Sequence, residues 1–190
     1  MIGLREITYS LYGAYRLCRF DSGGLSYLNT TIEGFWRSFF SAVLIAPLHF
    51  LIVALGFDPT PAASLWRIIV IEALTYVILV FAYPVIVHSV CQLLDRRGRY
   101  VSYIVAYNWA NVIQMALVFP VALLAASGLV PVAVTDVAQL AVTAVTLAMF
   151  WYIAKAALQV PGLTAAALVV IDVVLGLIVH TIADGRLSLS

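Results

Sequence analysis

Charged side chains are scarce in this chain: Asp, Glu, Lys and Arg make up only 10% of its 190 residues, whereas 64% are hydrophobic. Soluble domains carry roughly 25% charged residues. The mean hydropathy is +1.08, and a water-soluble domain of this length would leave much of its apolar surface in water. The composition therefore excludes a soluble globular protein and predicts one that is solvated by lipid. The net charge of +1 provides no basic field for a nucleic acid partner.

Cysteine and the common catalytic motifs are also nearly or wholly missing. Cys18 and Cys91 lie far apart and have neither CxxC nor zinc-type spacing, so no disulfide is predicted. The sequence contains no P-loop, dinucleotide-binding fingerprint, GxSxG nucleophile elbow or HExxH motif. We therefore expect no cofactor, no catalytic residues and no enzymatic activity.

Five long apolar segments make up most of the sequence. Each is long enough for a helix to cross the hydrocarbon core, which takes about 20 residues. Polar or Pro-containing breaks separate them, and the first is a turn at Asp58-Pro59-Thr60-Pro61. The sequence predicts an all-α fold, a polytopic membrane helix bundle in a transmembrane domain at 29–190. Its five transmembrane helices are expected at about residues 35–55, 66–94, 100–126, 133–158 and 163–183.

Residues 1–28 precede this domain and are expected to form a cytoplasmic amphipathic segment. Apolar side chains recur there at helical spacing, at Leu4, Ile7, Leu11, Ala14 and Cys18. Within residues 2–20 this stripe predicts a helix that either lies in the membrane interface or packs on the protein's own cytoplasmic face. Thr30, with Glu33 three residues later, matches a capping box and is expected to begin the next helix.

Basic residues are distributed unevenly between the two sides of the expected bundle. With the N-terminus in the cytoplasm, the outer side carries only Arg67 and Arg186. The inner side carries Arg5, Arg16, Arg19, Arg37, Arg96, Arg97, Arg99 and Lys155. The positive-inside rule then predicts a multi-pass protein of the cell inner (plasma) membrane, with its N-terminus cytoplasmic and its C-terminus outside. The basic loop of Arg96, Arg97 and Arg99 is expected to contact lipid headgroups of the bilayer.

The junction of the fourth and fifth spans has a recognisable pattern. Trp151 lies late in the fourth span, a short loop continues into Gly162-Leu163-Thr164, and the small residues 165–167 open the last span. This pattern resembles the Yip1-type membrane proteins. The resemblance implies five spans, an N-inside and C-outside arrangement, and a non-enzymatic role through contacts with other membrane proteins, with itself or with lipid. The acidic Gly-Pro signature of eukaryotic members is absent, and residues 34–40 resemble small bacterial inner-membrane proteins.

Polar residues inside the expected spans form a candidate intramembrane site. Asp172 lies near the middle of the fifth span, where a charged side chain costs roughly 2.5–3.5 kcal/mol on insertion scales. Asp136, Gln139, Thr143 and Thr146 recur at spacings of 3, 4 and 3, and this stripe is expected to face the bundle interior. The candidate site consists of Asp172, Glu72, His49, Asn111, Gln114, Gln139 and Thr143.

Two interpretations of the candidate site remain open. In one, it lines a hydrated pathway for a proton, an ion or a small polar solute, and the chain is a small transporter or channel component with Asp172 and Glu72 as functional acids. In the other, it supplies hydrogen bonds between helices of a scaffold protein, with Asp172 protonated or bonded to Asn111 or Gln114. The acidic and histidine residues lack metal-binding spacings, so no metal site is predicted.

Overall fold

The computed structural model describes residues 2–56 and 65–188, and within these ranges every regular element is helical. The elements are α1 (Leu4–Cys18), η1 (Ser22–Tyr27), α2 (Ile32–Ser38), α3 (Phe40–Leu55), α4 (Leu65–Leu93), η2 (Arg97–Arg99), α5 (Tyr100–Ser127), α6 (Val132–Leu158) and α7 (Gly162–Ser188). Five stretches are long and apolar enough to cross a membrane: Ile32–Leu55, Trp66–Leu93, Arg97–Ser127, Val132–Leu158 and Gly162–Ala183. The predicted all-α fold with five spanning helices is confirmed. The expected turn at 58–61 lies outside the described residues.

The first span consists of two helices, α2 and α3, which meet at Phe39. Its capping residue is Thr31 and not the expected Thr30, because Thr31 Oγ1 accepts a hydrogen bond from the Gly34 amide at 3.1 Å. Asn29 explains the difference: its Oδ1 accepts hydrogen bonds from both the backbone N–H (3.2 Å) and the hydroxyl (2.7 Å) of Thr31. These two bonds hold the Thr31 side chain in the capping position.

Short turns join the last three helices. Helix α5 ends at Gly128, whose φ of 64° is a left-handed conformation that glycine adopts without strain. Helix α6 ends at Gln159, also left-handed, and α7 follows at once. Trp151 Nε1 donates a hydrogen bond to the Gly162 carbonyl at 2.8 Å, which ties late α6 to the first turn of α7. The residues that carry the Yip1-type resemblance therefore meet in space.

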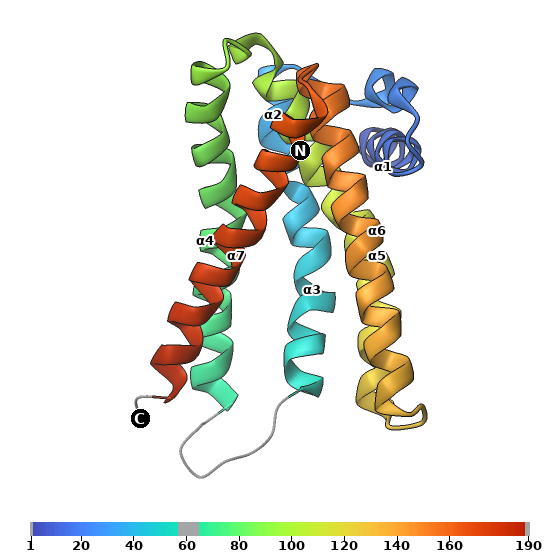
Figure 1. Ribbon diagram of the computed structural model, residues 1–190, viewed down its shortest axis with the longest axis vertical. Coiled ribbons are helices and arrows are strands. Elements are labelled where there is room, and N and C mark those ends of the chain that lie inside the picture. Colours follow the sequence, from blue (N-terminus) through green and yellow to red (C-terminus); the bar gives the residue numbers. More distant parts are fainter. Residues whose placement is uncertain (1, 57–64, 189–190) are drawn as a thin grey trace.

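The helices are packed closely at one end and spread apart at the other (Figure 1). We call the packed end the α1 end: it holds α1, α2, the α4–α5 loop with η2, and the α6–α7 turn. The C-terminal end of α7 lies at the opposite end. All eight cations expected on one side of the membrane belong to elements of the α1 end, whereas Arg67 lies in the first turn of α4 at the other.

Small side chains allow the close packing at the α1 end. Ala106 and Ala110 on α5 are fully buried, as are Ala154 and Ala157 on α6 and Ala165 on α7. These alanines belong to one cluster of buried residues that also contains larger side chains from α4 to α7. Apolar side chains are solvated as well by lipid as by a neighbouring helix, so the association of the helices has to be stabilised by close van der Waals contact. The core of the protein is therefore located at this end.

Helix α1 packs on the bundle, which is the second of the two positions expected for it. Ala14 and Leu17 are fully buried and belong to the same cluster as the side chains of α5 and α6. Glu6 accepts hydrogen bonds from Arg37 and Asn29, both at 2.9 Å, and so links α1 to the start of the first span. The buried cluster thus continues across the expected boundary between 1–28 and 29–190. Contact of the exposed face of α1 with lipid stays a prediction.

The chain folds back against α1 through η1. Arg16 Nε donates to Asp21 Oδ2 at 2.7 Å, and this hydrogen bond holds the pKa of the Asp21 carboxyl below its usual value. The two backbones meet at Gly13 and Gly24. A Cβ added to Gly24 would come closer than 3.0 Å to the Gly13 carbonyl oxygen and to the Leu17 side chain. Only glycine fits this contact.

We expect Gly24→Ala to destabilise the attachment of α1, because the added methyl group collides with the Gly13 backbone, which cannot move aside as a flexible side chain can. Overpacking of this kind costs about 1–3 kcal/mol. The purified protein in detergent should lose several degrees of apparent melting temperature. Gly98→Ala is the matched control, since nothing lies within 4 Å of its added Cβ. Equal melting temperatures for the two variants would contradict the packing described for Gly24.

Candidate functional site

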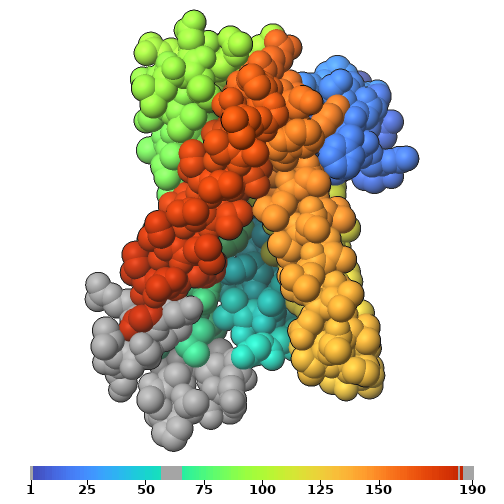
Figure 2. Space-filling model, viewed as in Figure 1, coloured from blue at the N-terminus to red at the C-terminus, as the bar shows by residue number. Residues whose placement is uncertain are grey.

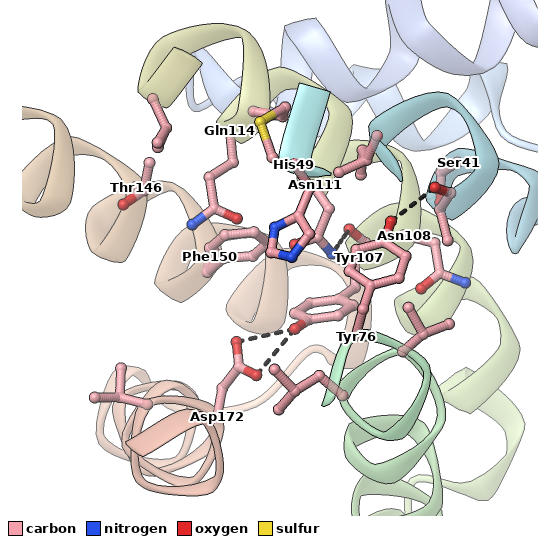
Figure 3. Close-up of a pocket in the computed structure, with 18 of the residues that line it drawn as sticks. Ser41, His49, Tyr76, Tyr107, Asn108, Asn111, Gln114, Thr146, Phe150 and Asp172 are labelled. Atoms are coloured by element: carbon pink, nitrogen blue, oxygen red, sulfur yellow. Dashed lines mark hydrogen bonds between the residues drawn. The ribbon is translucent and has the colours of Figure 1, made fainter. Parts of the chain in front are cut away.

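A cavity of about 540 Å³ lies between the spanning helices, adjacent to the packed core. All five spans contribute to its wall, and polar side chains from different helices point into it (Figure 3). The polar lining residues are Ser41, His49, Tyr76, Tyr107, Asn108, Asn111, Gln114, Thr146, Asp172 and His180. Four of the seven predicted site residues are therefore brought together here: His49, Asn111, Gln114 and Asp172.

Asp172 is held by a tyrosine of the facing helix. It lies ten residues after the start of α7 at Gly162, which is about 15 Å along the helix axis. The hydroxyl of Tyr107 on α5 is 2.9 Å from Oδ1 and 3.0 Å from Oδ2. Tyr107, and not the expected Asn111 or Gln114, is thus the hydrogen-bond partner. Within the described residues, no Lys, Arg or His forms an ion pair with Asp172.

Two further tyrosines support Tyr107 from behind. The hydroxyls of Tyr83 on α4 and Tyr103 on α5 are hydrogen-bonded at 2.6 Å, and both side chains are almost fully buried. The Tyr83 hydroxyl is also 3.4 Å from the Leu168 carbonyl oxygen on α7. The rings of Tyr83 and Tyr107 lie against one another, with centroids 4.5 Å apart. The orientation of the Tyr107 hydroxyl toward Asp172 is therefore fixed by packing from α4, α5 and α7.

His49 and Glu72 form a second polar pair. His49 Nε2 on α3 is 3.8 Å from Glu72 Oε2 on α4, which is too long for a hydrogen bond. This nitrogen is buried and has no hydrogen-bond partner among the described residues. The His49 ring lies beside Tyr76, with centroids 4.9 Å apart. His49 lines the cavity, whereas Glu72 is not among the lining residues and lies next to His49.

Amide side chains of α5 complete the polar wall. Asn108 Nδ2 donates to Ser38 Oγ at 2.8 Å, close to the junction of α2 and α3. Asn111 Nδ2 donates to the carbonyl oxygen of Tyr107, one turn earlier in its own helix, at 2.9 Å. The Asn111 and Gln114 side chains lie at the cavity beside Asp172 and His49 (Figure 3). These amides can donate to or accept from a polar molecule in the cavity.

The polar stripe of α6 is only partly internal, so the prediction that it faces the bundle interior is wrong for three of its four members. Thr146 is buried and lines the cavity, but Asp136, Gln139 and Thr143 are exposed. The Thr143 hydroxyl donates to the Gln139 carbonyl oxygen in its own helix at 2.8 Å, and so satisfies its polar group without a neighbouring helix.

Helix geometry and the spread of the bundle explain this exposure. At about 100° per residue, the three exposed members lie on the same sector of α6 as the cavity-lining Thr146, Leu147 and Phe150. The space-filling view shows a hollow between α6 and α7, with α3 at its floor (Figure 2). The stripe therefore lies on the same face of α6 as the cavity wall, but its three exposed members are on the part of α6 that has separated from α7.

Two other expectations concern the ends of the bundle. Arg96, Arg97 and Arg99 are exposed in the α4–α5 loop at the α1 end, and none of the three lines the cavity. Arg99 Nη2 donates to Gln159 Oε1 at 2.8 Å, which joins this loop to the α6–α7 turn. In the part of the chain that the structure describes, no group of three or more His, Cys, Asp or Glu side chains is placed to hold a metal ion.

The site predicted from the sequence does not include the aromatic residues of the cavity wall. Tyr76, Tyr107 and Phe150 all line it, although tyrosines of membrane proteins are usually placed at the interface. A signal for Tyr107 was present, because it precedes Asn111 by four residues and so lies on the same helix face. Nothing comparable singles out Phe150 among the many apolar residues of α6.

A hydrated cavity should make cysteines on its wall reactive toward a charged methanethiosulfonate reagent. In a background with Cys18→Ser and Cys91→Ala, we expect Asn111→Cys and Gln114→Cys, at two positions that line the cavity, to react about tenfold faster or more than Leu74→Cys, because thiolates form readily only in water. Leu74 is the control, since it is 61% exposed on α4, on a surface that faces lipid in a membrane. Uniformly slow labelling at all three positions would show that the cavity is dry.

Comparisons with known proteins provide no further assignment. No protein-family model, curated protein or solved structure matches this chain significantly. The resemblance of the α6–α7 junction to Yip1-type proteins accordingly stays a prediction.

Proposed function

We propose that this multi-pass membrane protein is a small transporter or channel component in which a proton or small solute passes through the cavity between the five spans. One observation carries the proposal: Asp172, a carboxyl group in the middle of a spanning helix, lies in the wall of a cavity of about 540 Å³. Ionisable residues in this position are costly, and they commonly mark ion or substrate pathways. The proposed role is non-enzymatic, because the solute crosses without a change in its covalent bonds.

The environment of Asp172 supports a pathway better than a purely structural bond. A single hydroxyl, that of Tyr107, reaches both carboxylate oxygens, so one proton is shared between two acceptors. A carboxylate offers about four lone-pair sites, and those not used by Tyr107 are available to the cavity. A structural contact would be satisfied as well by a neutral amide at lower cost, since buried charge is expensive in lipid. Asp172 is therefore the proposed exchange site.

Glu72 and His49 supply a second titratable pair for the same pathway. His49 is on the cavity wall, and its Nε2 lies 3.8 Å from a Glu72 carboxylate oxygen. A neutral imidazole can accept a proton at one nitrogen and release one at the other. In the proposed pathway, the pair exchanges protons between the cavity and the half of the bundle away from the α1 end.

The proposed orientation places the α1 end in the cytoplasm of a cell whose inner membrane holds the protein, with the C-terminus outside. The support is the gathering of eight of the ten Lys and Arg residues at that end. Exposed Arg96 and Arg97 are then positioned to attract anionic headgroups, at about 1 kcal/mol for each charge near the surface. The bilayer is the expected partner of this surface.

The scaffold role implied by the Yip1-type resemblance is the second candidate. The observation in its favour is that Trp151 and Gly162, which carry the resemblance, form a direct hydrogen bond at the α6–α7 turn. This contact stabilises the junction of two spans that could associate with other membrane proteins or with a second copy. A scaffold of this kind requires the fold but not the acid, so it predicts that Asp172→Asn is tolerated.

Asp172→Asn separates the two candidates. In liposomes with an internal pH-sensitive dye and an imposed pH gradient, we expect the unchanged protein to dissipate the gradient several-fold faster than protein-free liposomes. Asp172→Asn should lose nearly all of this flux, because an amide cannot exchange a proton, while its oxygen still accepts the hydrogen bond from Tyr107. Valinomycin and potassium on both sides hold the membrane potential at zero.

The matched control is Asp95→Asn, the same change at an exposed acid in the α4–α5 turn. It should retain full flux, and gel filtration with thermal melting should show all three proteins folded. Flux that is equal for the unchanged protein and Asp172→Asn contradicts the assigned role of Asp172. No flux above that of protein-free liposomes contradicts transport altogether and favours the scaffold.

A further inference from the structure

The charge of the cavity wall selects among possible solutes. Asp172 is the one carboxyl group among the described residues that line the cavity, and no Lys or Arg is among them. The basic side chains in the wall are the imidazoles of His49 and His180. An anion would meet an acid with no cation to balance it, whereas a cation would neutralise that acid. The wall is therefore complementary to positive charge.

Aromatic rings surround the acid and favour a particular type of cation. The Tyr107 and Phe150 rings lie side by side, with centroids 5.1 Å apart. Tyr76 lies across the cavity from Asp172 (Figure 3), and its hydroxyl is occupied by a hydrogen bond to the Ala42 carbonyl oxygen. The Tyr76 hydroxyl is therefore not free to bond a solute, and the residue contributes aromatic surface to the wall. Aromatic faces attract cations within about 6 Å, and most strongly where water is excluded.

The size of the cavity and its apolar portion indicate more than an inorganic ion. A volume of about 540 Å³ lies within the range of roughly 300–1,000 Å³ typical of sites for drug-sized molecules. Ile45, Leu79 and Val118 contribute apolar surface, as does Met115. A small hydrated cation would leave this surface without a partner. A larger ion with an apolar body would contact both the apolar wall and the acid.

The position of the opening indicates the route of entry. The hollow between α6 and α7 is open on the side of the bundle seen in Figure 2, and it widens toward the end opposite the α1 end. Both helices are within the stretches that are apolar enough to cross a membrane, so the opening faces lipid. Gly176 on α7 lines the cavity and carries no side chain that would narrow the gap. A solute that dissolves in the bilayer can therefore enter without first crossing the headgroup region.

We infer that the cavity binds a lipophilic organic cation, which enters from the bilayer between α6 and α7 and pairs with Asp172. The cation rests on the aromatic faces of Tyr107, Phe150 and Tyr76, and its apolar body contacts the remaining wall. This inference rests on the proposed transport function and names its substrate class. Cation binding and protonation neutralise the same carboxylate, so each excludes the other and the bound cation takes the place of one proton.

Tetraphenylphosphonium tests the inference, because tetraphenylborate has nearly the same shape and the opposite charge. Binding of the radiolabelled cation to purified protein in detergent is measured by equilibrium dialysis, with empty micelles and excess unlabelled cation as blanks. We expect saturable binding of tetraphenylphosphonium and none of tetraphenylborate. Asp172→Asn should weaken binding by about tenfold or more, since an ion pair in a desolvated site is lost. Asp95→Asn should stay within about twofold.

A second variant keeps the test decisive if Asp172→Asn does not fold. Nothing lies within 4 Å of a Cβ added at Gly176, which lines the cavity, so the side chain of Gly176→Leu starts in open space and takes up cavity volume. Leucine is also a better helix former than glycine by roughly 1 kcal/mol, so this variant should fold. It should weaken tetraphenylphosphonium binding by at least about tenfold.

The binding and flux measurements test the substrate class and the transport function separately. Absence of saturable tetraphenylphosphonium binding, equal binding of the borate, or full binding by both Asp172→Asn and Gly176→Leu overturns the inference. If binding fails while the Asp172-dependent proton flux persists, the transport function stands and the substrate class is wrong. If the cation binds as expected but no flux depends on Asp172, the binding site stands and the transport function is wrong.

Discussion

Close contact between small side chains at the α1 end is the constraint on which the rest of this structure depends. Lipid solvates apolar helices as well as their neighbours do, so helices associate only where backbones approach closely or polar groups bond. Ala106 and Ala110 on α5, and Ala154 and Ala157 on α6, are fully buried in one cluster, and their small side chains allow this approach. Away from this end the helices diverge, and a cavity remains between them (Figures 1 and 2). The cavity is thus a consequence of packing only one end.

Polar groups have different roles at the α1 end and in the middle of the bundle. At the α1 end they join segments, because Arg37 bonds to Glu6 and Arg99 bonds to Gln159. Both pairs are at least partly exposed, so they fix the relative positions of these segments but add little to the free energy of unfolding. In the middle of the bundle, the Tyr83, Tyr103 and Tyr107 hydroxyls lie among buried side chains. There each hydrogen bond substitutes for water that lipid does not provide. The tyrosines make it physically possible for Asp172 to remain at this depth.

Hydropathy predicted the five spans almost to the residue, because the thickness of the bilayer fixes the length of each apolar segment. It also predicted how far along the last span Asp172 lies. The rotation of each helix about its axis was less accessible, since it depends on packing against neighbours that are distant in sequence. For that reason the Tyr107 partner was missed, and Gln139 and Thr143 on α6 were expected to be internal. Periodicity placed the residues of the stripe on one face but could not show where α7 leaves that face.

The Trp151–Gly162 bond has a mechanical consequence. It joins α6 and α7 beside the turn that connects them, so a change in the angle between the two helices is a rotation about this point. Helix α7 is 27 residues long, or about 40 Å, and one degree of rotation at this point therefore moves its far end by about 0.7 Å. A change of a few degrees in one turn of backbone is enough to alter the gap at the far end by the width of a methyl group.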